Sequence, residues 1–541
     1  MVRATTASWA LVAIVVLSAC GGDESAPSGS GGGGANSCPT GQVDAPGGGC
    51  MPVGIQGCAD IFIEDDGLCH PSLDKCPPGT IPNFSEGCTA VGIPNCAPEF
   101  VEDDGLCHPS RDKCPPGSFA VPTEGCVSID GDGCGSGSWG LIADAPDTVW
   151  VDPSYAGGMS DGSQEAPFTT VAAALAAVAP GGRIALAAGD YAEPVTIDRP
   201  LELVGRCPSL VTLSGTQPTP YTNDPVIVLA DGAAGALVRG VRLSGAGIGL
   251  LAIGGDVELS GVHIDAVTAI GVVVANGTLH VTRSLLEATL SQPASGAFGR
   301  GIDVEAGASL SLDKSALAEN RDVALYVTHT GTTVTVSETL IENTLPQESD
   351  LAGGRGIEVQ DGASLSLDKS ALAENRDVAL FAAGAGTMVT VNDSLIENTL
   401  SQESDLAHGN GIGVQQGASI SLNKSALAEN RDVALVAGST GTTVRVSESL
   451  IKNTLPRESD LVGGRGIGMQ EGASLSLDKS ALAENREVAL FAADAGTTVS
   501  VSEILVENTL PRQSDLAYGW GIGVQEGASL SLDKSALAEN R

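Results

Sequence analysis

The chain has 541 residues, a net charge of −39 and only 3% aromatic residues. Nucleic-acid backbones are bound chiefly by lysine and arginine, so a chain this acidic is not expected to bind nucleic acid. The scarcity of aromatic residues also argues against an extended platform for stacking sugar rings. The acidic surface is compatible with weak association of Ca²⁺, and no other cofactor is predicted.

The N-terminal segment before Cys38 carries export signals rather than a folded domain. An apolar stretch too short to cross a membrane is followed by Leu-Ser-Ala-Cys at 17–20. This order resembles the lipobox of bacterial lipoproteins, which implies a signal peptide over residues 1–19 and a lipid on the Cys20 thiol. Gly21 follows, so the resemblance implies the outer membrane, with the protein either periplasmic or surface-exposed. Residues 20–37 are rich in Gly and Ser and predict a flexible tether.

A cysteine-rich region over residues 38–146 has a 38-residue repeat of its own. Exported proteins meet an oxidising environment, and small modules with few apolar residues need cross-links. Zinc is the alternative, but no CxxC occurs and each His of the region directly follows a Cys, which is poor ligand spacing. We expect Cys207 to pair with a cysteine of the last module, for which Cys134 is a candidate. Disulfides are predicted for Cys38, Cys50, Cys58, Cys69, Cys76, Cys88, Cys96, Cys107, Cys114, Cys126, Cys134 and Cys207.

Residues 147–541 alternate apolar and polar residues in short runs, as β-strands do. The opening segment contains Asp161-Gly162-Ser163, then Pro167-Phe168, an apolar helix from Val171 to Val178, and Gly-Asp-Tyr-Ala-Glu at 189–193. This order resembles the start of pectin-lyase-like proteins, including pectin methylesterases. The resemblance implies a right-handed parallel β-helix whose open end is capped by the helix, and it is not specific for catalysis.

Five near-identical copies of a 55-residue unit fill residues 299–541, after irregular coils that extend to about residue 298. The heptapeptide KSALAEN begins at Lys314 and returns once in each unit, for the last time at Lys534. Each unit splits into a short and a long turn of short strands, which favours coils of a β-helix over a helical repeat. The predicted fold class is therefore all-β: a right-handed single-stranded parallel β-helix of about 15 coils, ~70 Å long, after a small disulfide-rich region.

One asparagine ends each turn and is expected to have a structural role. The spacing between successive asparagines alternates between a shorter and a longer interval, as the two turns of each unit do. Their amides are expected to bond to the asparagine of the coil above and below, at the spacing of adjacent strands. A ladder of exposed ligand-binding amides is the alternative. The predicted ladder consists of Asn320, Asn343, Asn375, Asn398, Asn430, Asn453, Asn485, Asn508 and Asn540.

The repeats offer contact surfaces but no catalytic constellation. The lysine of KSALAEN is expected on a solvated face, with polysaccharide contact as the alternative. The position of Arg300 is occupied by Asn410 in one copy and by Trp520 in another, which indicates an exposed, unspecialised site. Nine-residue loops such as 344–352 project from every second coil and form a row of acidic loops. This row is the best candidate contact surface.

Catalytic motifs of the resembled families are missing from the sequence. Pectin methylesterase segments such as FQD and DFIFG do not occur, nor do the NTD and paired-Asp clusters typical of polygalacturonases. A catalytic site needs distinct residues placed once, which near-identical repeats do not provide. An unrepeated site would have to lie on the irregular coils, residues 207–298. Its polar candidates are Arg239, Arg242, Asp256, His263, Asp265 and His280.

The sequence therefore predicts a lipid-anchored envelope protein in which a disulfide-stapled stalk carries a β-helix, with no catalytic residues identified. Its role would be structural or adhesive, with the membrane as one partner and a polysaccharide or cell-surface protein as another. The alternative is a carbohydrate-active enzyme, a polysaccharide lyase or esterase, with an unrecognised site. Because no polar cap follows the last coil, we expect truncation of the sequence or, less favoured, end-on association.

Overall fold

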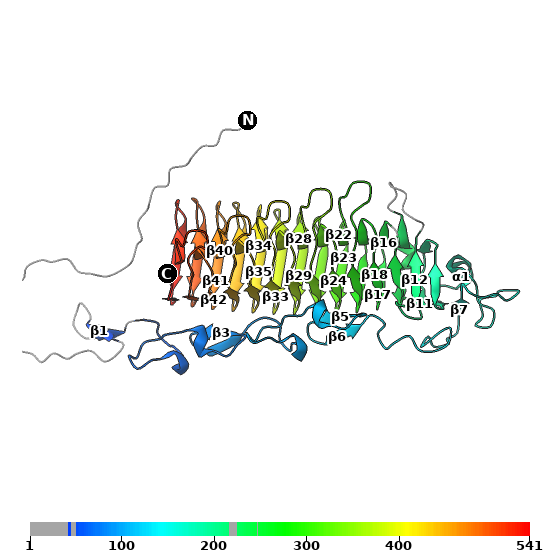
Figure 1. Ribbon diagram of the computed structural model, residues 1–541, viewed down its shortest axis with the longest axis horizontal. Coiled ribbons are helices and arrows are strands. Elements are labelled where there is room, and N and C mark those ends of the chain that lie inside the picture. Colours follow the sequence, from blue (N-terminus) through cyan, green and yellow to red (C-terminus); the bar gives the residue numbers. More distant parts are fainter. Residues whose placement is uncertain (1–41, 45–49, 53, 216–223, 246) are drawn as a thin grey trace, which may run out of the picture.

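The computed structural model describes residues 42–44, 50–52, 54–215, 224–245 and 247–541. A long solenoid of stacked strands begins at β7 (Thr148–Val151), and the cysteine-rich part runs beside it (Figure 1). We call this part the strap, defined as the described residues between 42 and 134. The solenoid strands pair in parallel with the strands one coil away. The predicted fold class, a right-handed parallel β-helix with a disulfide-rich region before it, is confirmed.

Each coil of the solenoid contributes up to three short strands, one to each of three sheets. In β26 (Thr333–Ser337) the two valines are buried while Thr333 and Thr335 are exposed, because side chains alternate across a strand. The strands on either side place Leu310 and Leu365 directly beside Val334. Apolar side chains therefore stack coil upon coil into one continuous core along the axis.

Within the residues that the structure describes, the three solenoid sheets have 13, 15 and 14 strands. The 13-stranded sheet contains β10 (Val195–Ile197), β13 (Pro225–Leu229), β16 (Ile248–Ile253), β19 (Ile270–Ala275), β22 (Arg300–Glu305), β25 (Val323–Val327), β28 (Arg355–Gln360), β31 (Val378–Ala383), β34 (Asn410–Gln415), β37 (Val433–Ala437), β40 (Arg465–Met469), β43 (Val488–Ala492) and β46 (Trp520–Val524). The 15-stranded sheet contains β7 and β26 with β8 (Arg183–Leu186), β11 (Glu202–Gly205), β14 (Leu237–Arg239), β17 (Asp256–Ser260), β20 (Thr278–Thr282), β23 (Ser309–Asp313), β29 (Ser364–Asp368), β32 (Met388–Asn392), β35 (Ser419–Asn423), β38 (Thr443–Ser447), β41 (Ser474–Asp478), β44 (Thr498–Ser502) and β47 (Ser529–Asp533). The 14-stranded sheet contains β9 (Gly189–Tyr191), β12 (Val211–Ser214), β15 (Arg242–Ser244), β18 (His263–Asp265), β21 (Leu285–Glu287), β24 (Ala316–Ala318), β27 (Leu340–Glu342), β30 (Ala371–Ala373), β33 (Leu395–Glu397), β36 (Ala426–Ala428), β39 (Leu450–Lys452), β42 (Ala481–Ala483), β45 (Leu505–Glu507) and β48 (Ala536–Ala538).

Helix α1 (Val171–Ala177) closes the N-terminal end of the core, as the sequence predicts. The Thr170 hydroxyl accepts a hydrogen bond from the N–H of Ala173 at 3.2 Å, which is an ordinary N-terminal cap. The carboxylate of Glu193 accepts two more, from the N–H groups of Val171 (2.7 Å) and Ala172 (3.0 Å). The acidic residue of the Gly-Asp-Tyr-Ala-Glu segment thus satisfies helix N–H groups that would otherwise lack partners.

The strap is built from short hairpins and single 3₁₀ turns cross-linked by disulfides. Its elements are β1 (Gln42–Asp44), β2 (Cys50–Pro52), η1 (Asp60–Phe62), η2 (Leu73–Lys75), β3 (Thr80–Asn83), β4 (Gly87–Ala90), η3 (Pro98–Phe100), η4 (Arg111–Lys113), β5 (Ser118–Val121) and β6 (Gly125–Ser128). Disulfides in the described residues join Cys58–Cys69, Cys76–Cys88, Cys96–Cys107, Cys114–Cys126 and Cys134–Cys207. The predicted bond between Cys207 and Cys134 is therefore present, whereas Cys38 and Cys20 lie outside the described residues.

The strap is not a stalk, and this part of the prediction is wrong. The disulfide Cys134–Cys207 fixes its C-terminal end to the first coils of the solenoid. From there the strap runs back along the solenoid toward the last coils, where the N–H of Leu73 donates to the Glu507 carboxylate at 3.1 Å (Figure 1). The cysteine-rich region therefore lies along the solenoid instead of extending away from its end.

The reason for this packing is the outward face of the 14-stranded sheet, which is apolar. In this sheet Leu340 and Ala371 point outward, on the opposite side of the strand from core residues such as Ile341. Leucine and alanine alternate in this column from Leu285 to Leu505, and all of them are buried beneath the strap. The strap contributes Ile81, Phe84, Phe100, Leu106 and Phe119 to the same cluster. The modules thus have a core after all, which they share with the solenoid.

Candidate functional site on the open face of the 13-stranded sheet

The strap interface contains a second outward column, in which charged residues replace the leucines. Glu287, Glu342, Glu397, Lys452 and Glu507 recur once in each repeat, with alanines between them. Each contacts the strap. The N–H of Arg111 donates to Glu342, and Lys452 Nζ lies 2.5 Å from Asp104 Oδ2. These contacts fix the register of the strap on the solenoid.

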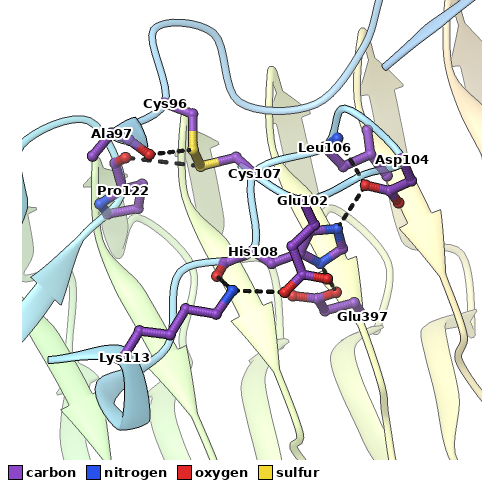
Figure 2. The surroundings of a disulfide bond; sticks show 10 residues. All are labelled: Cys96, Ala97, Glu102, Asp104, Leu106, Cys107, His108, Lys113, Pro122 and Glu397. Atoms are coloured by element: carbon purple, nitrogen blue, oxygen red, sulfur yellow. Dashed lines mark hydrogen bonds and ion pairs between the residues drawn. A yellow bond between two sulfur atoms is a disulfide. The ribbon is translucent and has the colours of Figure 1, made fainter. Parts of the chain in front are cut away.

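His108 of the strap lies between two carboxylates, Glu397 of the solenoid and Asp104 of the strap (Figure 2). Its Nδ1 lies 2.6 Å from Glu397 and its Nε2 lies 3.1 Å from Asp104. Burial opposes the charged imidazole, but the hydrogen bonds to Asp104 and Glu397 outweigh burial and raise the pKa of His108 to about 10. For Asp104, burial likewise opposes the charge, and the bonds from His108 and Lys452 lower its pKa. His108 therefore binds the strap to the solenoid as a cation.

A cleft of about 740 Å³ lies beside His108, between strap and solenoid. Nine carboxylates line it, against three basic side chains, His108, Lys113 and Lys452. Burial raises the pKa of one of these carboxylates, Glu342, to about 7, although the N–H of Arg111 hydrogen-bonds to it. The excess of acid in this interface makes strap packing sensitive to pH and salt.

The asparagines form two series with different roles, which corrects the predicted ladder. In the first, Asn375 is fully buried; its Oδ1 accepts from the Thr344 hydroxyl at 2.6 Å and its Nδ2 donates to the carbonyl of Ile341 at 3.0 Å. Its amide therefore contacts threonine in the neighbouring coil, not asparagine. The same bonds recur at Asn320, Asn430, Asn485 and Asn540.

The second asparagine series lies one residue out of line with the first. Asn343 precedes the ladder threonine, has a φ of 49° and corresponds to Glu319 (φ 54°) of the previous coil. The asparagines of this series occupy a turn position with left-handed backbone conformation, which asparagine adopts more readily than most residues. The buried ladder consequently alternates Asn and Thr. The residues wrongly placed in it are Asn343, Asn398, Asn453 and Asn508.

The polar residues of the irregular coils do not converge. Arg239 pairs with Glu202 on the 15-stranded sheet, and His280 pairs with Asp256 in an exposed position on the same sheet. On the 14-stranded sheet Arg242 binds Asp265 through two hydrogen bonds. His263 lies on that sheet too, 2.8 Å from Glu287, which also contacts Arg111 of the strap. Each candidate is thus occupied in a local ion pair, and the six do not share one site.

An arginine–aromatic stripe on the open face of the 13-stranded sheet was missed by sequence reasoning. Arg300 lies 4.1 Å from the ring centroid of Tyr326, one coil away. The same contact recurs in the next repeat between Arg355 and Phe381, at 4.8 Å. The third occurs between Arg465 and Phe491 at 5.1 Å. We call these three pairs the stripe.

The stripe corrects the interpretation of position 300 as unspecialised. The one repeat with Asn410 in place of the arginine has Val436 in place of the aromatic residue, so both partners change together. In the last copy Trp520 replaces the arginine, is 47% exposed and packs edge-on against Tyr518. The side chain at this position thus contacts an aromatic ring in four of the five copies.

Carboxylates hold the arginines of the stripe in place. Arg355 donates to Asp377 at 2.8 Å and to Glu358 at 2.9 Å, and Arg300 makes the same contacts with Asp322 and Asp303. Burial raises the pKa of Asp303 to about 6, against the opposing effect of Arg300. The stripe therefore presents flat, partly exposed aromatic and guanidinium groups with carboxylates at the side.

A row of loops projects from every second coil, as the sequence predicts, and it borders the stripe on one side. They occupy residues 291–299, 346–354, 401–409, 456–464 and 511–519. Three of their glutamates are held by arginines of the coil beneath, as in Arg376–Glu403 at 3.2 Å. Backbone bonds also join neighbouring loops, for example the N–H of Ser349 to the carbonyl of Gly296 at 2.8 Å. The loops are therefore held in a regular row by these hydrogen bonds and ion pairs.

The described residues contain one group with metal-ligand spacing, Asp130, Cys134 and Cys207, and its two sulfurs are joined in a disulfide. This group lacks free thiolates and does not fit a metal. In the same part of the chain, no helix is long and apolar enough to cross a membrane.

Comparison with known proteins assigns no family to this chain. No protein-family model matches the chain. No curated protein matches it. Similar solved structures include a pectate lyase (13% identity, 72% of this chain and 78% of that one, TM-score 0.31). Others are a GH87 α-1,3-glucanase catalytic unit from Streptomyces thermodiastaticus (14%, 73% and 70%, 0.36) and an alginate lyase from Paenibacillus (14%, 61% and 99%, 0.33). These identities and scores carry no argument about activity.

Proposed function

We propose that this protein is a lipid-anchored scaffold of the cell envelope whose open face binds an extended polysaccharide. The observation that carries the proposal is the stripe, in which Arg300–Tyr326, Arg355–Phe381 and Arg465–Phe491 repeat the same contact along one exposed sheet. The first two pairs are two coils apart, or ~10 Å, and the third lies four coils, or ~19 Å, beyond the second. An extended chain that follows the sheet would reach all three pairs.

The chemistry of the stripe supports sugar binding better than protein or nucleic-acid binding. Aromatic rings offer apolar area with little conformational entropy to lose, while guanidinium and carboxylate groups donate to and accept from hydroxyls. The arginines are already paired with acids, so the stripe has no excess of positive charge for phosphates. Repetition of a weak contact along one chain would supply the affinity by avidity.

Attachment at Cys20 and an outer-membrane location complete the proposal. The Leu-Ser-Ala-Cys sequence and the five disulfides of the described residues support export to an oxidising compartment. Mass spectrometry of the N-terminal peptide tests the anchor: it should begin at Cys20 and carry acyl chains. Recovery of a peptide with unmodified Cys20, or of an uncleaved signal, would contradict this part alone.

Binding is tested with the purified chain against acidic and neutral polysaccharides, with and without Ca²⁺, while product formation is followed. The variant Tyr326→Ala/Phe381→Ala/Phe491→Ala should bind at least ten times more weakly than the wild type, on the order of 1.4–3 kcal/mol for the three contacts together. Val436→Ala, in the same column of the sheet but without an arginine partner, is the matched control and should bind normally. Equal loss in both variants would refute the role of the stripe, and turnover would favour the enzyme alternative.

A further inference from the structure

A row of exposed leucines runs along the loops that border the stripe. Leu351, Leu406, Leu461 and Leu516 occur once in each repeat and are 45%, 45%, 42% and 78% exposed. Neighbours are two coils apart, so the row advances in steps of ~9.6 Å and spans ~29 Å. We call these four side chains the leucine row. Single exposed leucines are ordinary on protein surfaces, whereas a regular row of them indicates a contact surface.

The backbone makes leucine a costly choice at these positions. All four residues are left-handed, with φ between 56° and 58°. Each donates its N–H to the carbonyl four residues earlier, as Leu406 does to Gln402 at 2.9 Å. The first loop makes the same bond with Gly296 (φ 68°), which adopts this conformation freely. Leucine costs about 1–2 kcal/mol more than glycine there.

Local packing recovers only part of that cost. Leu516 is 78% exposed, and the other three leucines are 42–45% exposed. Nearly half of each side chain still faces solvent. Since glycine meets the requirement of the turn in the first loop, the exposed half of each leucine indicates a function outside the fold.

We propose that the leucine row is the contact through which two copies of this chain associate, antiparallel about a twofold axis. A partner must present apolar groups at the same step as the row, ~9.6 Å, over its whole length. A second copy does so by construction, because its leucines have the same spacing in either direction. Twofold pairing also closes on itself, as most homodimers do.

The charges along the row favour the antiparallel arrangement. The first two leucine loops carry two acids each and no arginine: Glu348 and Asp350, then Glu403 and Asp405. The third and fourth loops gain Arg457 and Arg512, and the fourth also loses its glutamate. A parallel pair would set the acidic loops against each other. An antiparallel pair sets them against the arginine-bearing loops, which are less negative because Arg457 and Arg512 pair with Asp460 and Asp515, and so reduces the like-charge repulsion.

The size of the surface predicts a weak dimer. A strip ~29 Å long and one loop wide buries on the order of 1,000 Å² in total, at the lower end for specific association, so a Kd in the micromolar range is expected. Each copy carries a net charge of −39. Association should therefore strengthen as salt rises, because screening reduces the overall repulsion.

Sedimentation equilibrium of the full chain carrying Cys20→Ser, over about 1–100 µM, tests the proposal. The wild-type row should give a monomer–dimer equilibrium, and Leu351→Gly/Leu406→Gly/Leu461→Gly/Leu516→Gly should weaken it at least tenfold. Glycine is the residue of the first loop, so this variant should unfold at the same or a higher temperature. Met388→Ser, which removes an exposed methionine from β32, should leave the dimer unchanged. A monomer at every concentration, or an undiminished dimer in the glycine variant, would overturn the proposal.

The direction of pairing is measured separately with a spin label at Ser514→Cys. In an antiparallel dimer this residue faces the loop of Leu351 in the other copy, so the two labels should be ~30 Å apart. A separation below about 15 Å, within three or so coils, would indicate parallel pairing and refute the antiparallel arrangement.

Discussion

Two faces of the same solenoid show that the outward side chains of a sheet determine whether it is covered by the strap or stays exposed. On the 14-stranded sheet the outward positions carry Leu340, Ala371 and their repeats, and the strap buries them. On the 13-stranded sheet they carry Arg355, Phe381 and their repeats, which remain partly exposed. Both faces rest on the same core of inward leucine, isoleucine and valine. The inward residues thus build the β-helix, and the outward residues assign one face to internal packing and another to contacts with partners.

The largest expected effect comes from placing a charge beneath the strap. Ala426 is fully buried between strap and solenoid. Ala426→Asp should destabilise strap packing by about 3–5 kcal/mol, because an unpaired carboxylate would be buried. Urea unfolding and limited proteolysis of the strap measure this. Thr390→Asp, exposed on β32, should change stability by less than about 0.5 kcal/mol. If the two variants behaved alike, the strap would not be tightly packed on this sheet.

A smaller effect is expected from titrating the strap interface. Folding raises the pKa of His108 from 6.5 to about 10, so the folded state holds this proton more tightly than the unfolded state. The resulting stabilisation is complete below about pH 6.5 and is lost as the pH rises toward 10, on the order of 3 kcal/mol. Glu342, whose pKa is raised to about 7, acts in the same direction below pH 7.

Urea unfolding of wild type and His108→Gln between pH 6 and pH 10 measures this effect. The variant should be less stable at pH 6 and should lose the steepest part of the pH dependence. His70→Gln is the matched control, because His70 occupies the same place in the preceding module but is exposed and pairs only with Asp66 in the structure. A pH profile that His108→Gln leaves unchanged would show that the His108–Glu397 contact does not hold the strap.

The smallest expected effect is the interaction energy between arginine and aromatic side chains on the 13-stranded sheet. A double-mutant cycle of Arg355→Met and Phe381→Ala should give a coupling energy of about 0.5–1 kcal/mol, the size of a partly exposed cation–π contact. The cycle of Asn410→Ala and Val436→Ala at the corresponding positions should give a value near zero. Coupling of the same size in both cycles would mean that the stripe is ordinary sheet packing.

The β-helix could be predicted because its signals are local. Alternation of Val334 and Val336 with threonine, the 55-residue repeat and the segment around α1 each depend on residues close in sequence. The bond between Cys207 and Cys134 followed because Cys207 is the one cysteine beyond the cysteine-rich region. The packing of the strap on the solenoid was not predicted, although the sequence contained a signal for it. Strands such as Ala371–Ala373 place no polar residue on either face, so both faces need to be covered.

The stripe escaped prediction for a different physical reason. Arg355 and Phe381 belong to different coils and meet only because the solenoid stacks one coil on the next. The recurrence of an aromatic residue at 326, 381 and 491, and the joint change to Asn410 and Val436, were readable signals. The prediction of the asparagine ladder was wrong by one residue in every second coil. In the sequence Asn343 and Asn320 look equivalent, but strand pairing aligns Asn320 with Thr344.

The contacts that fix the strap also set a constant ratio between the number of strap modules and the number of solenoid repeats. The N–H groups of Leu73 and Arg111, which are one module apart in the strap, bind Glu507 and Glu342, which are three repeats apart in the solenoid. One strap module thus spans six coils, or ~29 Å. Gain or loss of a single repeat would shift every strap contact beyond it by a third of a module. Duplication can therefore lengthen this molecule in register only when three solenoid repeats and one strap module are added together.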